Sequence, residues 1–345
     1  MGFDQNDNFS VPPGQPEPEP VYVQQAPPKK RTGWKVFWAI VIILSVLANI
    51  IFFMALIGMV AVFATTQDGI FTEDIIVAGP AATKIAVINL QDLIDDETAE
   101  DIYKQIKRAS EDENVKGLII RVNSPGGTVA ASDRINQEIL KYKDETEKPV
   151  VAFMQDIATS GGYYASVAAD KIVAEPTIIT GSIGVIFGHF VIRELLEEKL
   201  GIEPVIIKSG EKKDWPSPFS ETTDAQRRYI ERKLITPAYE RFVRIVADQR
   251  AELSADDVRQ LADGSIYNAD EALENKMIDQ IGYLDDAIET AKELAGVEKA
   301  RVVEYKEPFS FASFLRSGQS SRLKIDKTTL YEFTKPQLLY LWTID

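Results

Sequence analysis

The chain has 345 residues, 45% of them apolar, which is enough for one or two domains once non-globular parts are set aside. Its formal net charge of −15 argues against a nucleic-acid partner, because neutralising phosphates takes clustered Lys and Arg. The absence of cysteine excludes disulfides, thiol nucleophiles and cysteine-bound metals. The single histidine, His189, excludes the metalloprotease motif that needs two, so a hydrolase built on this chain has to work without histidine.

The N-terminal region is predicted to be a disordered tail followed by a membrane helix. Residues 1–33 are rich in proline, glutamine and acidic side chains and end in a basic flank, a composition that cannot bury enough apolar surface to fold. Residues 34–64 follow as an apolar helix, longer than the roughly 20 residues that a bilayer core needs. A cleaved signal peptide is the alternative, but its apolar region usually has about 7–15 residues. Because basic residues flank only the N-terminal side, the tail is predicted to be cytoplasmic and the rest to lie outside a bacterial-type cell membrane, crossed once.

After a predicted linker at 65–83, residues 84–306 alternate between strand and helix patterns, and 307–345 are predicted to be a C-terminal tail. Strand candidates lie at 85–90, 117–122, 149–154, 171–174 and 204–208, and helix candidates at 98–111, 132–142, 160–169, 191–200 and 223–251. Repeated strand–helix units with apolar strands indicate an α/β fold in which helices cover both faces of a parallel sheet. Pro237 predicts a kink or break inside the last helix.

Three loops follow predicted strands, at the sheet edge where α/β folds place ligands. The first is Asn123-Ser-Pro-Gly-Gly127, whose two glycines let the backbone turn and point N–H groups at a bound oxygen, as an oxyanion hole requires. An ordinary strand-to-helix turn is the other interpretation. The second loop places Ser160 before Gly161 and Gly162 at the start of a helix, where it is either a nucleophile or a helix cap.

The third loop, residues 208–214, contains Lys212 and Lys213. A serine nucleophile needs a base, and a lysine can act as one only as the neutral amine, which requires that its pKa fall from about 10.4. A solvated charged loop is the alternative. Ser209 and Lys212 also match a Ser-x-x-Lys pattern of penicillin-recognising enzymes, although they lie on a turn and not at a helix start.

The order of these motifs resembles the signal peptide peptidase A family, in its short form with one protease domain. The resemblance covers roughly residues 84–295 and rests on Asn-Ser-Pro-Gly-Gly (123–127), Ser-Gly-Gly-Tyr-Tyr (160–164), Ala-Ala-Asp-Lys-Ile-Val-Ala (168–174), Thr-Gly-Ser-Ile-Gly-Val (180–185), Lys-Ser-Gly-x-x-Lys-Asp (208–214), Asp263-Gly264, Tyr267, Ala272 and Ile278-Asp279. It implies a Clp-protease/crotonase-like fold and a ring of single-domain copies.

The resemblance also implies roles for particular residues. Ser160 would be the nucleophile and Lys213 the base, favoured over Lys212 because the family pattern places the lysine directly before an aspartate. Ser182 would hold the lysine amine by a hydrogen bond. The backbone N–H groups of the oxyanion hole would come from Gly126, Gly127 and Gly161. His189 has no role in this pattern and is expected to be structural.

The predicted function is therefore a membrane-anchored serine endopeptidase with a Ser-Lys dyad that degrades cleaved signal peptides and other apolar peptides. No metal and no organic cofactor is expected. The alternatives are a stomatin-associated membrane protease with the same dyad, a crotonase-like acyl-CoA enzyme, and an inactive membrane scaffold. The apolar stretch 337–342 needs a partner, and we expect it to pack on a neighbouring subunit, with membrane contact or docking on its own domain as alternatives.

Overall fold

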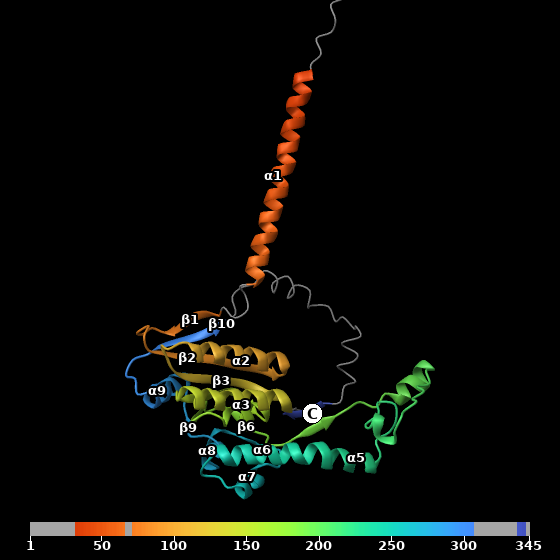
Figure 1. Ribbon diagram of the computed structural model, residues 1–345. Coiled ribbons are helices and arrows are strands. Elements are labelled where there is room, and N and C mark those ends of the chain that lie inside the picture. The colour runs from red at the N-terminus through yellow and green to blue at the C-terminus, as the bar shows by residue number, and fades with distance from the viewer. Residues whose placement is uncertain (1–31, 66–70, 307–336, 343–345) are drawn as a thin grey trace, which may run out of the picture. The chain divides into compact units, whose positions relative to one another are not determined.

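The computed structural model describes residues 32–65, 71–306 and 337–342 and divides the chain into an N-terminal helical unit and a globular body (Figure 1). The predicted tail at 1–33 falls almost wholly outside the described residues. The helical unit is α1 (Thr32–Thr65), in which Gly33–Met59 has a mean hydropathy of 3.0 and none of its residues is buried inside the protein. By length and composition α1 can cross a membrane, as predicted for 34–64.

The body is built on one mixed sheet. Its strands are β1 (Thr72–Val77), β2 (Lys84–Ile94), β3 (Val115–Thr128), β4 (Val150–Thr159), β5 (Lys171–Ala174), β6 (Ile179–Gly181), β7 (Ile186–Gly188), β8 (Ile266–Tyr267), β9 (Gln280–Ile281), β10 (Arg301–Lys306) and β11 (Gln337–Leu341). The main path runs β1-β10-β2-β3-β4-β5-β9 and is parallel from β10 to β9, whereas β1 is an antiparallel edge. The predicted α/β class and parallel sheet are confirmed.

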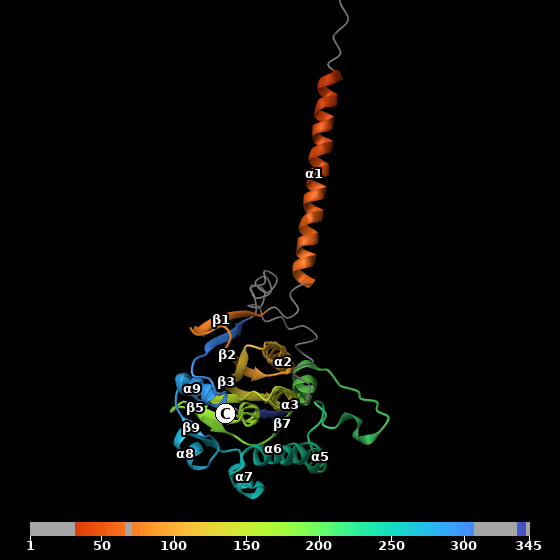
Figure 2. The same cartoon turned by 60° about the vertical axis from the view of Figure 1, so that its left-hand side comes forward.

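Helices connect the strands and cover both faces of the sheet (Figure 2). They are α2 (Asp96–Glu111), α3 (Val129–Thr146), α4 (Gly161–Ser166), α5 (Asp224–Ile230), α6 (Thr236–Gln249), α7 (Ala255–Leu261), α8 (Ala269–Glu274) and α9 (Leu284–Leu294), with shorter turns at Leu195–Lys199, Glu211–Asp214 and Glu231–Ile235. The predicted break near Pro237 lies just before it, where the π-turn Glu231–Ile235 joins α5 to α6. Proline has no N–H to continue the helical bonding at that point.

Two apolar clusters lie on opposite faces of the sheet because successive strand residues point to opposite sides. In β2, Ile85 and Val87 face α9 in the smaller cluster, whereas Ala86 and Ile88 belong to the larger cluster with α2, α3, α4 and α6. All four side chains are fully buried. Burial on both faces explains why the strands read as unbroken apolar runs in the sequence.

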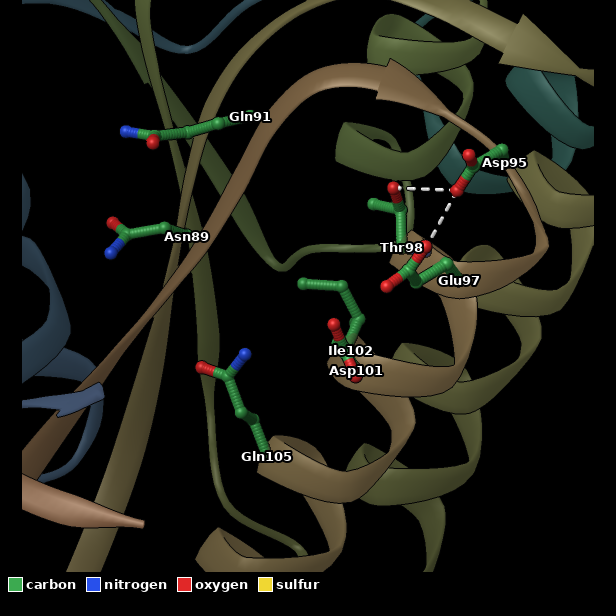
Figure 3. A pocket seen from close by; sticks show the side chains of 8 residues that line it. All are labelled: Asn89, Gln91, Asp95, Glu97, Thr98, Asp101, Ile102 and Gln105. Carbon is green, nitrogen blue, oxygen red and sulfur yellow. Dashed lines mark hydrogen bonds between the residues drawn. The ribbon is translucent and has the colours of Figure 1, made fainter. Parts of the chain in front are cut away.

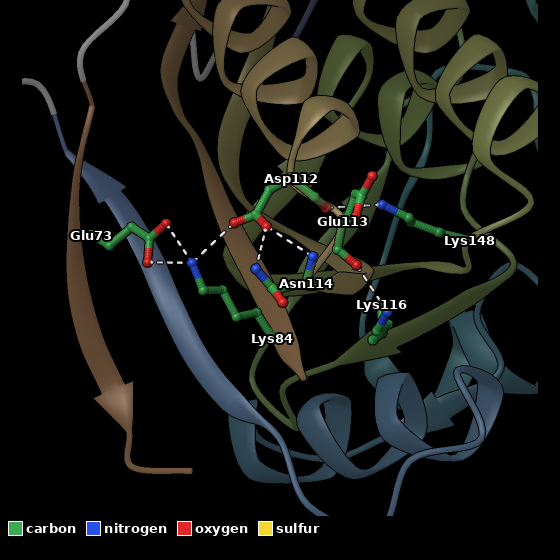
Figure 4. A network of polar contacts seen from close by, with 7 residues as sticks. All are labelled: Glu73, Lys84, Asp112, Glu113, Asn114, Lys116 and Lys148. Atoms are coloured by element: carbon green, nitrogen blue, oxygen red, sulfur yellow. Dashed lines mark hydrogen bonds and ion pairs between the residues drawn. The ribbon is translucent and has the colours of Figure 1, made fainter. Parts of the chain in front are cut away.

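The sheet extends beyond the predicted domain boundary at residue 84. The predicted linker contains β1, which pairs with β10, and Glu73 of β1 accepts hydrogen bonds of 2.9 Å from Lys84 Nζ (Figure 4). Lys84 also donates to Asp112, so one ammonium group joins β1, β2 and the end of α2. The linker prediction missed this strand because β1 is exposed on its outer side and lacks the apolar pattern of a central strand.

Two local predictions differ from the structure. Residues 204–208 have no regular secondary structure, and Val205 and Ile207 are 76% and 95% exposed, because no neighbouring strand pairs with this apolar segment. The predicted loop at 123–127 is instead the end of β3, which pairs with β2 on one side and with β11 farther along.

Several motif residues have structural roles in this sheet. Asp279 accepts hydrogen bonds from Arg250 Nη1 at 2.7 Å, from Ile172 N at 2.8 Å and from Lys171 Nζ at 3.1 Å. Burial alone would raise the pKa of Asp279, but the hydrogen bond and charge of Arg250 outweigh it and hold this pKa below its ordinary value. Asp170 accepts from Val150 N at 2.8 Å in the same way.

We expect Asp279→Asn to lower the free energy of unfolding at neutral pH by about 3 kcal/mol, because it leaves the largely buried Arg250 without its charge partner. A carboxylate with a lowered folded-state pKa stabilises the fold above its unfolded pKa of about 3.9, and this contribution is lost as the pH falls through the folded value. The deficit of the variant should therefore shrink below about pH 4. Urea unfolding of the full-length protein in mild detergent measures this. Asp256→Asn, which removes an exposed pair with Arg259, is the matched control and should change little.

Candidate active site

Ser160 lies on the turn from β4 to α4 and is only 1% exposed. Its backbone angles are φ 54° and ψ −112°, a region that residues with a side chain rarely occupy and that costs about 1–3 kcal/mol. Although Ser160 precedes the first helical residue, its side chain makes no capping hydrogen bond. The capping interpretation from the sequence is therefore wrong, and strain of this kind is typical of functional sites.

Ser182 lies beside Ser160 because β6 pairs with the end of β4, matching Gly181 with Thr159. The Ser160 N–H donates to the Gly181 carbonyl at 2.7 Å, and the Ser182 N–H donates to the Ser265 carbonyl at 2.7 Å. Ser182 also has a positive φ of 49° and is 8% exposed. The structure thus places the two serines of the predicted site on adjoining strained turns.

The three predicted oxyanion glycines come together next to Ser160. A Cβ atom on Gly161 would lie 3.1 Å from both Gly126 Cα and Gly127 N, and one on Gly127 would lie 1.9 Å from the Ile94 carbonyl oxygen. Gly126 has a φ of 101°. Close backbone approach and a positive φ both require glycine at these positions. The sequence did not indicate the role of Ser124, which donates to the Asp92 carbonyl and accepts from Gly126 N at 3.1 Å, fixing the glycine segment. The Gly126 N–H predicted for the oxyanion hole is therefore already engaged by the Ser124 hydroxyl.

The structure does not bring Lys213 to this site. Lys213 lies in the 3₁₀ turn Glu211–Asp214, is exposed, and its Nζ contacts neither Ser160 nor Ser182 through a hydrogen bond in the described part of the chain. Its neighbour Lys212 is held differently, with Nζ 5.6 Å from the Trp215 ring centre and 5.0 Å from that of Tyr229. Because side chains in a 3₁₀ turn are spaced about a third of a turn apart, the anchored Lys212 leaves Lys213 pointing elsewhere.

We name residues 189–222 the arm. It follows β7 and reaches away from the sheet, in green in Figures 1 and 2. Its apolar side chains are widely exposed, among them Phe190, Leu200 and Ile202 at 64%, 59% and 52%. Several large apolar side chains exposed on one segment are typical of a protein–protein or membrane contact. His189 lies on the arm, where Nε2 is 2.8 Å from Thr222 Oγ1, so its visible contact is within the arm.

A pocket of about 310 Å³ lies elsewhere, between β2 and the first turns of α2 (Figure 3). It is lined by polar and acidic side chains, and its Asp95 accepts from Thr98 N at 2.9 Å as the N-cap of α2. The acidic residues there serve the helix start, where carboxylates are stabilised by the free N–H groups. The pocket contains none of the predicted site residues.

Comparisons with known proteins agree with this fold. The model of peptidase family S49 matches residues 142–298, and the Clp protease model matches residues 77–173, so the two together span Ser160 and the glycine segment 123–127. The chain is a serine peptidase of the α/β class with a Clp-protease-like fold.

The chain belongs to the signal peptide peptidase A family. It is 36% identical over 254 residues to the putative signal peptide peptidase SppA of Enterococcus faecium, covering 70% of this chain and 73% of that protein. It is 35% identical to the putative protease slr0021 of Synechocystis over 64% of this chain and 77% of the relative. It is also 34% identical to the chloroplastic serine protease SPPA of Arabidopsis thaliana, over 67% of this chain but only 34% of that longer protein.

Proposed function

We propose that this protein is a membrane-anchored serine endopeptidase that uses Ser160 as nucleophile and Lys213 as base. The observation that carries the proposal is the strained, buried Ser160, whose side chain makes no capping hydrogen bond and which directly precedes Gly161, itself packed against Gly126 and Gly127. A nucleophile held beside backbone N–H groups is the arrangement that acyl transfer needs. Because the chain belongs to a peptidase family, we favour a peptidase over the crotonase-like acyl-CoA enzyme.

The proposed reaction has two acyl-transfer steps. Neutral Lys213 takes the Ser160 proton while Ser160 Oγ bonds to the peptide carbonyl carbon, and the N–H groups of Gly127 and Gly161 hold the oxyanion. Collapse breaks the peptide C–N bond, and Lys213 gives its proton to the leaving amine. Water then attacks the acyl-enzyme with the same lysine as base, releasing the acid and restoring Ser160. Ser182 would orient the lysine amine between these steps.

We infer from the exposed position of Lys213 that the dyad is completed by assembly. Ser160, Ser182 and the glycines already lie together within one chain, whereas Lys213 lies on the arm with exposed apolar residues around it. We propose that the arm packs on a neighbouring copy in a ring and places Lys213 beside that copy's Ser160. Burial at this contact would also disfavour the charged form of a lysine, as a base at neutral pH requires.

The proposed substrates are signal peptides left in the membrane after preprotein cleavage, and other apolar peptides. Support comes from the name of the Enterococcus faecium relative and from α1, which is apolar enough to hold the protease at a bilayer. Basic residues lie before α1 and not directly after it, which favours a cytoplasmic N-terminus and an extracytoplasmic protease domain.

One experiment tests both substrate class and orientation. A labelled synthetic signal peptide is added to intact spheroplasts that carry either the wild-type protein or the Ser160→Ala variant. We expect degradation outside the cells by the wild type alone, without lysis. Degradation only after lysis would contradict the orientation, and no serine-dependent degradation even in detergent would contradict the substrate class.

A further inference from the structure

The turn that carries Lys213 is closed by an ion pair between its two ends. Lys208 Nζ donates to Asp214 Oδ1 at 2.7 Å, and the two side chains are 35% and 25% exposed. Between them the backbone forms the 3₁₀ turn Glu211–Asp214, in which the Lys213 N–H donates to the Gly210 carbonyl at 3.1 Å. The ion pair therefore fixes the direction in which the Asp214 carboxylate points.

Lys213 itself has a different surrounding from the other two lysines of this segment. Lys208 is paired with Asp214, and Lys212 lies over the rings of Trp215 and Tyr229, whereas no ion pair within the described residues joins Lys213 to a carboxylate. Asp214 directly follows Lys213, and neighbouring Cα atoms are only about 3.8 Å apart. Its carboxylate is thus within reach of the Lys213 ammonium and is held by Lys208 instead.

The charge next to Lys213 bears directly on its proposed role as a base. Lys213 can take the Ser160 proton only as the neutral amine, and a carboxylate within about 4–6 Å of a lysine favours the ammonium form. The hydrogen bond and the charge of Lys208 hold the pKa of Asp214 below its ordinary value, so this carboxylate is ionised at neutral pH. The Lys208 ammonium neutralises that negative charge, and as a like charge it also disfavours the charged form of Lys213.

Other titratable groups lie on the turn, on α5 beside it, and near the serines that the lysine has to reach; they are Glu211, Lys212, Tyr229 and Asp263. Tyr229 of α5 faces Lys212, whose Nζ is 5.0 Å from the centre of its ring. Asp263 accepts from the Ser265 N–H at 2.9 Å, and the Ser265 carbonyl in turn accepts from the Ser182 N–H. The Asp263 carboxylate is therefore engaged by the backbone, which leaves Asp214 as the carboxylate that a change in one side chain could release next to Lys213.

We propose that Lys208 is a positioning residue for the reaction: by binding Asp214 it keeps this carboxylate off Lys213, so that the Lys213 amine can serve as a base. The proposal rests on the proposed Ser160–Lys213 mechanism and adds a role for the ion pair. Without Lys208 the freed Asp214 would pair with the adjacent ammonium and raise the pKa of Lys213 by about one unit, at the low end of the effect of an opposite charge at this range. One unit means about tenfold less neutral lysine at any pH well below that pKa.

Rescue by a second substitution separates this charge effect from a structural one. In Lys208→Met the ionisation that governs kcat/KM should move up by about one pH unit, and the rate at neutral pH should fall about tenfold. Adding Asp214→Asn removes the freed charge and should return the ionisation close to its wild-type position. The profiles are measured on full-length protein in detergent with a fluorogenic apolar peptide. An unchanged ionisation in Lys208→Met, or a shift that persists in the double variant, would overturn the proposal.

Arg193→Met is the matched control, because it removes another ion pair of the arm, Arg193 Nε to Glu197 Oε2 at 3.0 Å, and should not move the ionisation. An equal shift in this variant would contradict a specific role of Lys208.

A measurement without turnover separates the ion pair from the protease mechanism. Trace acetylation with acetic anhydride over a pH series, mapped by mass spectrometry on full-length Ser160→Ala protein, follows the neutral fraction of Lys213 directly. Lys208→Met should shift this curve upward by about one unit, and Asp214→Asn should reverse the shift. A shift in acetylation without one in the rate profile would retain the effect of Lys208 on the amine and reject Lys213 as the base. No shift in acetylation would overturn the role of Lys208 and leave the protease assignment intact.

Discussion

Peptide hydrolysis is expected to fall by about 10³-fold or more in Ser160→Ala and by a similar factor in Lys213→Ala, because each removes one member of a unit that acts together. For the same reason the double variant should be little worse than either single one. Initial rates with a fluorogenic apolar peptide, measured on full-length protein in detergent, give these factors. Thermal unfolding of each variant should match the wild type, since Lys213 is exposed and loss of the Ser160 hydroxyl removes no capping bond.

Lys212→Ala is the control for the lysine assignment. Lys212 lies over the rings of Trp215 and Tyr229, so its loss should loosen the turn and lower the rate by no more than about tenfold. Lys212→Arg keeps the ring contact and should recover most of that loss. An inactive Lys212→Ala beside an active Lys213→Ala would mean that the base is the other lysine.

Mixed assemblies of the two inactive variants show whether Lys213 comes from the same chain as Ser160 or from a neighbouring copy. If the arm of one copy supplies Lys213 to the Ser160 of its neighbour, co-assembly of Ser160→Ala and Lys213→Ala subunits should restore about a quarter of the sites in a random ring. Separately assembled and then mixed proteins are the control and should stay inactive. No recovery in co-assembled rings would contradict the proposed contribution from a neighbour.

The pH dependence of the rate should follow a lysine base. The ammonium form cannot accept a proton, so kcat/KM should rise with pH along one ionisation above neutrality, without a limb near pH 6.5 that a histidine base would give. His189→Ala should leave both the profile and the rate unchanged. Ser182→Ala should lower kcat more than it raises KM, because it loosens the orientation of the amine and not the binding of the peptide. An ionisation near 6.5 that disappears in His189→Ala would contradict the Ser-Lys mechanism.

The sequence predicted the central strands well because burial on both faces leaves a continuous apolar run, as in Ile85–Leu90 of β2 and in β4. It failed where pairing depends on distant residues. β1 is stabilised by β10, more than 200 positions away, and β11 pairs with β3 and β7, which lie well over 100 positions earlier in the chain. Local patterns carry no information about such contacts.

The residues of the candidate site were likewise predictable only in part. Ser160, Ser182 and the glycines could be named from their motifs, because tight turns restrict which residues fit, as the φ of 101° at Gly126 illustrates. The network in which the Tyr164 hydroxyl and Arg241 both donate to Asp133 could not, since these three residues come from three helices and look like ordinary amphipathic residues in sequence. The conformation of the Lys213 turn was equally unpredictable, because it depends on Trp215 and Tyr229 side by side.

The most direct measurement is covalent labelling of the full-length protein in membranes with a serine-reactive fluorophosphonate, followed by mass-spectrometric mapping of the modified residue. The account predicts a single label on Ser160 that is absent in Ser160→Ala and strongly reduced in Lys213→Ala, where no base activates the hydroxyl. A label on another serine that persists in Ser160→Ala would contradict the assignment of Ser160 as the nucleophile.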